Sequence, residues 1–391
     1  MSLPAVVYLP DAASRPWLSR RVAGRSVLLR LLLTAVRAGV SDIGLPSGLA
    51  DASLLSQIRR HPRLSRAVFP LEDRRLGSGA ILLLPAQSVV DAGSLRKLCE
   101  AGQRGISAAI EESKGGPAPV MVLSGADAEP IKDRLVAGAP IGEELEGRLR
   151  SAKVTLVHGG GHVVPVTDAR SLREAEAALY RSLGTEADSV IDRLINRPCS
   201  RLLTRLLVQF PVTPNQVTLL SLAFGLAAGW LFWSATPVSA LLGLVAYLLS
   251  VVVDHADGDI ARLSFEESAL GQWLDLSADT ITHALVTLAI AVTASRAGGP
   301  LMLLGGALAS VGVVMSALVA NLVLPRMGRP QQLGRALTRL GTRDTFYLVL
   351  IAFIALLWTT PAGLPFLVGL LALGSQAYWL TALFAWMRPA R

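Results

Sequence analysis

Six long apolar stretches in the second half of the chain constrain its fold more than any other feature. Each is about 20 residues long, which is the length an α-helix needs to cross the hydrocarbon core of a bilayer. Charged residues gather in short islands between the stretches. The sequence therefore predicts an all-α domain of six transmembrane helices over residues 212–391. The expected spans are 215–235, 238–257, 272–295, 299–324, 344–360 and 363–387.

Four aspartates, Asp254, Asp257, Asp275 and Asp279, lie at the ends of the second and third spans. A carboxylate at bilayer depth is costly unless it is paired or bound to a metal. Spacings of three and four residues place each pair on one face of its helix. Converging carboxylates repel one another without cations, and ligation by oxygen alone points to Mg²⁺ or Mn²⁺. Two such ions could neutralise a pyrophosphate and its leaving group.

The stretch from Asp254 to Asp279 resembles the signature of the CDP-alcohol phosphotransferase family, D-x2-D-G-x2-A-R-x8-G-x3-D-x3-D. The segment "TPNQVT" at 213–218 and the six-span layout are also similar to that family. The resemblance covers the chain from about residue 186 to its end. The fixed positions of the signature are all matched without a gap, by Asp254, Asp257, Gly258, Ala261, Arg262, Gly271, Asp275 and Asp279.

The resemblance implies a transferase in which an acceptor hydroxyl attacks the phosphorus that bears the donor alcohol of a CDP-alcohol, and CMP leaves. It assigns metal binding to Asp254, Asp257 and Asp275. It makes Asp279 the general base, with a fourth metal ligand as the alternative role. Since Asp279 lies one turn further along its span, we expect it to be buried beyond the metals. The residues that would line the CDP pocket or lie near its phosphates are Asn215, Thr218, Gly258, Ala261, Arg262 and Gly271.

The substrates stay open at this point, within phospholipid or polyol-phosphate synthesis. The donor and acceptor could be diacylglycerol, inositol, inositol phosphate, glycerol phosphate or another polyol, and a homodimer is the expected assembly. A purely structural role, in which the acids cap helices or pair with loop arginines, is the alternative for any one aspartate. His283 is expected to be a packed helix residue. Arg343 and Asp344 could touch an acceptor phosphate or anchor the topology.

Basic residues predict the orientation in the membrane. The net charge is +8, but the basic residues of the second half are arginines at the ends of apolar segments. This pattern favours cytoplasmic membrane loops over a nucleic-acid surface. We therefore expect an inner-membrane protein with both termini in the cytoplasm. Residues 186–211 should form juxtamembrane amphipathic helices whose arginines reach lipid phosphates, with a solvated linker helix as the alternative. These arginines are Arg193, Arg197, Arg201 and Arg205.

Residues 1–185 predict a cytoplasmic α/β domain, because short apolar runs alternate with amphipathic helical patterns. The runs at 5–9, 42–45, 80–84 and 119–123 are the expected strands of a mostly parallel sheet. The domain resembles the nucleotidyltransferase part of cytidylyltransferase–phosphotransferase fusions.

The chemical parts of a nucleotidyltransferase are missing from this domain. "LPDAASRPW" after the first strand has no glycine to wrap a triphosphate. The positions where the metal-binding acids of a nucleotidyltransferase are expected hold no acid, and the nearby Asp91 and Asp168 are out of register with them. The segment "GGG" at 159–161 indicates a turn and not a phosphate-binding loop. We therefore expect residues 1–185 to be a catalytically inactive relative of the nucleotidyltransferases.

Two other functions compete with a single membrane transferase. In the first, the chain is bifunctional and its front domain also makes the CDP-alcohol. In the second, it is a transporter with a carboxylate cluster, which would place the acids near the bilayer midplane in broken helices. The acids lie instead at the ends of continuous apolar spans. The transferase is therefore the interpretation that the sequence favours.

Overall fold

The computed structural model describes residues 3–73, 79–111, 117–137, 139–143, 145, 147, 155–158, 161–184, 188–323 and 343–387. The chain divides into two compact units, Met1–Leu183 and Gly184–Arg391. This division falls close to residue 185, where the composition changes from a mixed to an apolar sequence.

The first unit is built on a seven-stranded sheet with the order β10-β8-β9-β6-β1-β4-β5. Strand β1 pairs in parallel with β4 and β6, whereas β9 is antiparallel to both β6 and β8. The expectation of a mostly parallel sheet is confirmed, and the four predicted strands are β1, β4, β6 and β9. The strands are β1 (Ala5–Tyr8), β4 (Ile43–Leu45), β5 (Val68–Pro70), β6 (Ile81–Pro85), β8 (Ala108–Glu111), β9 (Pro117–Leu123) and β10 (Thr155–Val157).

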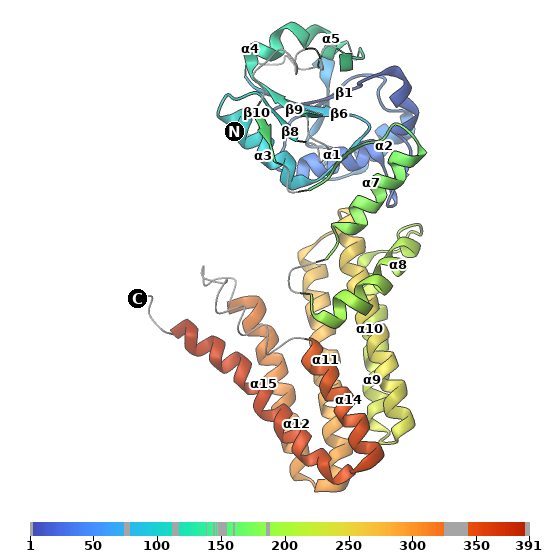
Figure 1. Ribbon diagram of the computed structural model, residues 1–391, viewed down its shortest axis with the longest axis vertical. Helices are drawn as coiled ribbons and strands as arrows, with labels where there is room; N and C mark the ends of the chain where they lie inside the picture. The colour runs from blue at the N-terminus through green and yellow to red at the C-terminus, as the bar shows by residue number, and fades with distance from the viewer. Residues whose placement is uncertain are drawn as a thin grey trace. The chain divides into compact units, whose positions relative to one another are not determined.

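Helices cover both faces of this sheet. Figure 1 shows α1 and α3 on one side of the strands and α4 and α5 on the other. Buried aliphatic side chains such as Val6, Leu83 and Met121 form the core beneath them. The helices of the unit are α1 (Val27–Arg37), α2 (Ala52–Arg60), α3 (Ala92–Gln103), α4 (Gly125–Ala128), α5 (Lys132–Val136) and α7 (Ala169–Arg181).

Two short ribbons complete the first unit. Strands β2 (Arg21–Val22) and β3 (Arg25–Ser26) form a hairpin, and β7 (Ser88–Val90) pairs with β11 (Val163–Pro165). Arg30 is buried in α1 and donates hydrogen bonds to the carbonyl oxygens of Val22 and Ala23 at 3.0 and 2.9 Å. Burial lowers the pKa of Arg30 to about 10, so its guanidinium stays charged at neutral pH and holds the hairpin on the helix.

The second unit is helical. Five helices of the described part are long and apolar enough to cross a membrane, and they cover five of the six predicted spans. The fifth prediction, 344–360, coincides with a helix of 17 residues, shorter than the ~20 that a perpendicular span needs, so six crossings are not confirmed. The helices are α9 (Pro214–Trp233), α10 (Pro237–Ser264), α11 (Ala269–Gly298), α12 (Leu301–Leu318), α14 (Arg343–Thr359) and α15 (Leu364–Met387).

Capping residues set where these helices begin. Thr213 accepts a hydrogen bond from the main-chain N–H of Gln216, and the Gln216 side chain accepts one from the N–H of Thr213. Thr236 and Ser239 form the same reciprocal pair at the start of α10. Each pair satisfies main-chain donors that the first helical turn leaves open. Both helices also carry proline in their first turn, where no N–H is needed.

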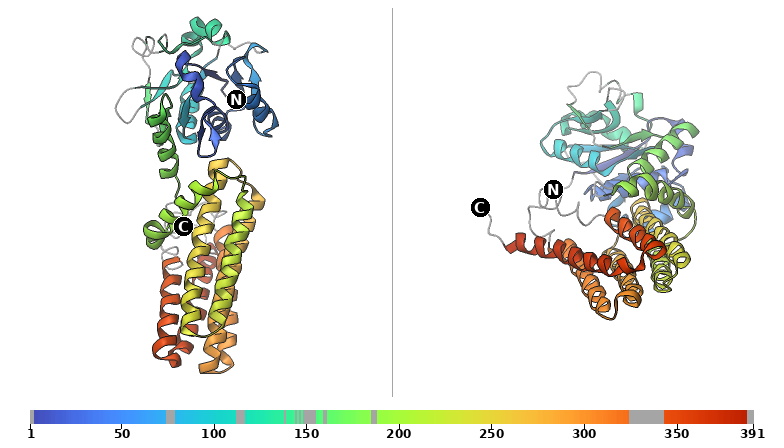
Figure 2. Two further views of the ribbon diagram at one scale, coloured as in Figure 1. Left: turned by 90° about the vertical axis from the view of Figure 1, so that its right-hand side faces the viewer. Right: turned by 60° about the horizontal axis from the view of Figure 1, so that its bottom comes forward.

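Helix α9 packs along both α10 and α11 (Figures 1 and 2). A Cβ added at Gly225 of α9 would lie only 2.2 Å from Oγ1 of Thr282 in α11. The two helices can therefore approach this closely only because Gly225 has no side chain.

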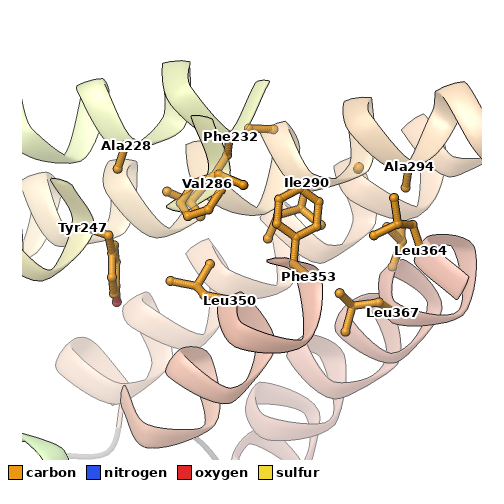
Figure 3. Packing of buried hydrophobic residues seen from close by; sticks show 14 of the residues in the cluster. Ala228, Phe232, Tyr247, Val286, Ile290, Ala294, Leu350, Phe353, Leu364 and Leu367 are labelled. Atoms are coloured by element: carbon orange, nitrogen blue, oxygen red, sulfur yellow. The ribbon is translucent and has the colours of Figure 1, made fainter. Parts of the chain in front are cut away.

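An apolar core joins α9, α10, α11, α14 and α15. Figure 3 shows Phe232 of α9 and Phe353 of α14 facing Ile290 of α11. The two phenylalanine rings meet edge to face with centroids 5.7 Å apart, an arrangement that aromatic quadrupoles favour. Leu364 and Leu367 of α15 close the same cluster.

The juxtamembrane segment has its polar face inside and its apolar face outside. Its helical part is a π-helical turn, η4 (Asp192–Asn196), followed by α8 (Arg197–Leu207). An exposed apolar face on a helix next to the first span is the arrangement of a helix at the membrane interface. The buried residues are Asp192, Asn196, Arg197, Ser200 and Thr204, and the exposed apolar ones are Val190, Leu194, Ile195, Leu202, Leu206 and Phe210.

The prediction that Arg197 reaches lipid phosphates is wrong. Its side chain is only 7% exposed and forms ion pairs with Asp188 and Asp259. Since it starts α8 on the polar side of the helix, it points into the bundle and not towards solvent. Arg193 and Arg205 are exposed, so contact with lipid phosphates stays a prediction for these two residues. The arginine-rich loop 326–341 lies outside the described residues.

Candidate active site

Three carboxylates meet between α10 and α11. Asp254, Asp257 and Asp275 each offer an oxygen, and these oxygens all lie within 4.8 Å of one another. Asp254 and Asp257 are buried and Asp275 is half-buried. Like charges this close in a poorly solvated place need a neutralising partner. A set of oxygen donors alone fits Mg²⁺ or Mn²⁺, so these three residues are suited to hold divalent metal.

The helical hairpin explains why these acids converge. Helix α10 ends at Ser264, Phe265 turns the chain in the left-handed region (φ 60°), and α11 begins at Ala269 behind its N-cap Ser268. Asp257 lies seven residues before the end of α10 and Asp275 six residues after the start of α11. At 1.5 Å per residue, both lie about 10 Å from the turn. The spacing in the sequence therefore brings them to the same depth.

Helix α9 contributes its first turns to the site. Thr218 is buried, and its hydroxyl lies 2.5 Å from Oδ2 of Asp257, to which it donates. Oδ1 of Asn215 lies 3.2 Å from the place that a Cβ at Gly271 would occupy, so a side chain at 271 would press on Asn215. Thr218 thus contacts the metal candidate Asp257, and Asn215 lies beside Gly271; their place in a CDP pocket stays a prediction. Gly258 and Ala261 of α10 are partly exposed.

Arg262 folds back along α10. Its Nη1 and Nη2 atoms lie 3.4 and 3.5 Å from where a Cβ at Gly258 would stand. Its Nη2 also lies 2.5 Å from Oδ1 of Asp259. Asp259 is not among the predicted site residues, although an acid three residues before an arginine in an apolar helix is a signal visible in the sequence.

Asp279 stands apart from the three metal candidates. It does not belong to the group with oxygens within 4.8 Å, although it lies one helical turn from Asp275. The expectation that it is buried is wrong, since 35% of its side chain is exposed. Its Oδ1 lies 3.9 Å from Nδ1 of His283, one turn further along α11. A partly exposed carboxylate one turn from the metal candidate Asp275 is accessible to small molecules.

His283 packs as the sequence predicted. Its ring lies edge-on to Tyr247 and Phe346, with centroids 5.8 and 4.8 Å away. Its Nδ1 donates to the main-chain oxygen of Asp279 at 2.7 Å, and the Tyr247 hydroxyl donates to Nε2 at 2.9 Å. Both nitrogens are thereby engaged within the bundle.

Asp344 is an anchor for the juxtamembrane segment. Its two carboxylate oxygens accept hydrogen bonds from the main-chain N–H groups of Val190 and Ile191, at 2.9 and 3.2 Å. Of the two roles considered for Asp344, these contacts support the anchor. The side chain of Arg343 lies outside the described part.

In the first unit, the acids closest to the expected nucleotide-binding positions cap helices. After β1 the chain forms a short helical turn, Ala12–Trp17, capped by Asp11. Asp91 accepts from the N–H of Ser94 at the start of α3, and Asp168 from the N–H of Ser171 at the start of α7. Hydrogen bonding to the Ser171 N–H lowers the pKa of Asp168. Gly159 and Gly160 of the "GGG" segment lie outside the described residues.

The helical unit is similar to a known family of proteins. Residues 211–387 match the family model of CDP-alcohol phosphatidyltransferase. Two relatives are both named bifunctional IPC transferase and DIPP synthase. The one from Thermococcus kodakarensis is 34% identical over 124 residues, which is 31% of this chain and 27% of the relative. The one from Archaeoglobus fulgidus is 30% identical over 165 residues, 42% of this chain and 32% of the relative.

The chain thus matches about a third or less of the length of each of these relatives. Among solved structures, a glucose-1-phosphate thymidylyltransferase from Bacillus anthracis is similar with a TM-score of 0.36 and 11% sequence identity. The match covers 47% of this chain and 97% of that structure.

Proposed function

From the CDP-alcohol phosphatidyltransferase domain at residues 211–387, we propose that this chain is a multi-pass membrane enzyme that transfers a phospho-alcohol group from a CDP-alcohol to an acceptor hydroxyl and releases CMP. The observation that carries the proposal is the meeting of three carboxylates within 4.8 Å at the end of two membrane helices. The reaction needs such a site, because the diphosphate of the donor is anionic. Cations on the phosphate oxygens favour attack of the acceptor hydroxyl on the phosphorus that bears the alcohol and the departure of CMP.

The residues divide into three roles. Asp254, Asp257 and Asp275 would hold the metal, which supplies positive charge to the diphosphate when bound. Asp279 would accept the proton of the attacking hydroxyl, since its carboxylate is partly exposed and stands outside the metal group. We propose two ions, because the diphosphate and the departing CMP both carry negative charge that cations would neutralise.

The remaining residues of the signature would bind the nucleotide. Arg262 presents a planar guanidinium, which suits phosphate oxygens. Gly258, Ala261 and Gly271 leave room for the ligand, because none has a side chain larger than a methyl group. Asn215 and Thr218, in the first turns of α9, would lie near the phosphates, where a helix N-terminus favours anions.

The test is a substrate panel. Purified full-length protein is given CDP-diacylglycerol, CDP-inositol or CDP-glycerol with alcohol and polyol-phosphate acceptors, Mg²⁺ or Mn²⁺ being present. CMP release from at least one pair is the expected result. No CMP from any pair would remove the assignment.

A transporter fits the structure less well. Transporter sites commonly lie in interrupted helices near the bilayer midplane. Here α10 and α11 run without a break from Pro237 to Ser264 and from Ala269 to Gly298. The acids lie in the halves of these helices next to their connecting turn.

A bifunctional enzyme is the second candidate, because both relatives carry that word in their names. Against it, the segment after β1 holds a capped helical turn and no glycine, and Asp91 and Asp168 cap helices. We therefore predict that full-length protein given CTP and an alcohol phosphate releases no pyrophosphate above background. A pyrophosphate assay with inositol phosphate and glycerol phosphate checks this. Release that depends on the alcohol phosphate would establish the bifunctional enzyme instead.

The proposed location is the cytoplasmic membrane, with both ends and the arginine-rich loops in the cytoplasm and a homodimer as the assembly. Arginine asymmetry between loops motivates this orientation. Reporter fusions after residue 341 should report a cytoplasmic position, and fusions in the uncharged turn at 234–239 an external one. A reversed pattern would contradict the orientation.

A further inference from the structure

Helix α10 carries a third acid that the proposed chemistry leaves unused. Asp259 is fully buried, with 0% of its surface exposed, and it is not part of the metal group. It follows Asp257 by two residues, and at 100° per residue this turns it about 200° around the helix. Asp259 therefore points away from the metal side, and a carboxylate buried there requires a positive partner.

Two arginines share one oxygen of Asp259. Nη1 of Arg197 lies 3.3 Å from Oδ1, and Nη2 of Arg262 lies 2.5 Å from the same atom. Arg197 is also held by Asp188 through two hydrogen bonds of 2.8 Å each. The result is a chain of alternating charges, with two acids and two arginines, from the juxtamembrane helix α8 to the guanidinium of Arg262.

This chain ends at Arg262, which the proposed function assigns to the nucleotide. The guanidinium of Arg262 lies over Gly258, 3.4 Å from the position of a missing Cβ, and Gly258 directly follows the metal candidate Asp257. The side chain of Arg262 is 40% exposed. Ordering so exposed an arginine costs side-chain entropy, and the bond to Asp259 favours the rotamer that lies along the helix.

We propose that Asp259 is a positioning residue that holds the guanidinium of Arg262 for the diphosphate of the CDP-alcohol, an inference that rests on the proposed function. The fully buried carboxylate is itself fixed by Arg197, so Arg262 is attached to a rigid support. A guanidinium that is already in place binds a phosphate with less loss of conformational freedom than a mobile one. Asp259 thus acts through Arg262 and touches neither metal nor substrate.

The experiment is a double-mutant cycle with CDP as the probe. Detergent-solubilised full-length protein with Mg²⁺ is titrated with CDP for the wild type, Asp259→Asn, Arg262→Ala and the double variant. Asp259→Asn should weaken CDP binding by about tenfold, and Arg262→Ala by at least as much. The double variant should bind no more weakly than Arg262→Ala alone, because Asp259 has no route to the ligand once the guanidinium is gone.

A matched control separates positioning from stability. Asp188→Asn removes an acid of the same cluster but on the side of Arg197, and it should leave CDP affinity within about twofold of wild type. Thermal unfolding of every variant is measured in parallel. If Asp259→Asn cannot be purified, Asp259→Glu takes its place. The longer side chain displaces the guanidinium, and it should weaken CDP binding in the wild type and not in Arg262→Ala.

The outcomes are distinct. Wild-type affinity in Asp259→Asn or its substitute, beside weak binding by Arg262→Ala, would overturn the inference and leave the proposed function standing. An equal further loss in the Arg262→Ala background, or an equal loss in Asp188→Asn, would assign Asp259 a purely structural role. A wild-type protein that binds no CDP with Mg²⁺ would overturn the proposed function, and the inference with it.

Discussion

Replacing Asp279 by asparagine should lower the rate of CMP release by on the order of 10²–10⁴, the usual effect of removing a general base. Metal and CDP-alcohol affinities should stay close to those of the wild type. The reason is that Asp279 stands outside the group of three carboxylates within 4.8 Å and keeps 35% of its side chain exposed. Asparagine preserves the size of the side chain but cannot accept the proton.

The matched control for this prediction is Asp275→Asn, one turn earlier on α11. That variant should lose metal affinity and turnover together, because Asp275 belongs to the metal group. Metal binding by calorimetry and CMP release are measured on both proteins. If Asp279→Asn loses metal affinity as severely as Asp275→Asn, Asp279 is a fourth ligand and the base must be sought elsewhere.

Removal of divalent cations should abolish turnover altogether. Asp254, Asp257 and Asp275 place three acidic side chains around one point, two of them buried. An anionic diphosphate cannot approach this point without cations, since like charges repel strongly where water is scarce. Excess chelator should therefore stop CMP release, and added Mg²⁺ or Mn²⁺ should restore it.

Two variants refine the metal prediction. Asp257→Asn should need a much higher metal concentration for any remaining activity. Glu266→Gln removes an acid from the turn between α10 and α11 and should leave the metal dependence unchanged, because Glu266 is exposed and lies outside the group. Full activity in chelator would exclude a metal role for the three aspartates.

Much of the membrane unit could be predicted from the sequence because its physics is local. Apolar length decides a span, and the starts of α9 and α10 follow from Thr213 and Thr236 with proline in the next position. The meeting of Asp257 with Asp275 also follows from local rules, since both are a similar number of residues from one turn. For these features, knowing the helix and its ends was enough.

Other features depended on which neighbour each helix face meets. The repeat of arginines in residues 193–205 favoured lipid phosphates for all of them, but Arg197 pairs with Asp188 and Asp259. Periodicity identifies the face of a helix, but it does not say whether lipid or another helix covers that face. For the same reason Asp279 was expected to be buried and is partly exposed.

The sequence by itself determined the two-part organisation, the helical membrane unit and the set of acids that come together, since chain length, hydrophobicity and residue spacing act within one element or across one turn. Only the tertiary structure decided the pairing of Asp259 with Arg197 and the separation of Asp279 from the three other carboxylates. These depend on contacts between elements up to 62 residues apart. Such contacts arise from how helices pack, and no local pattern in the chain encodes them.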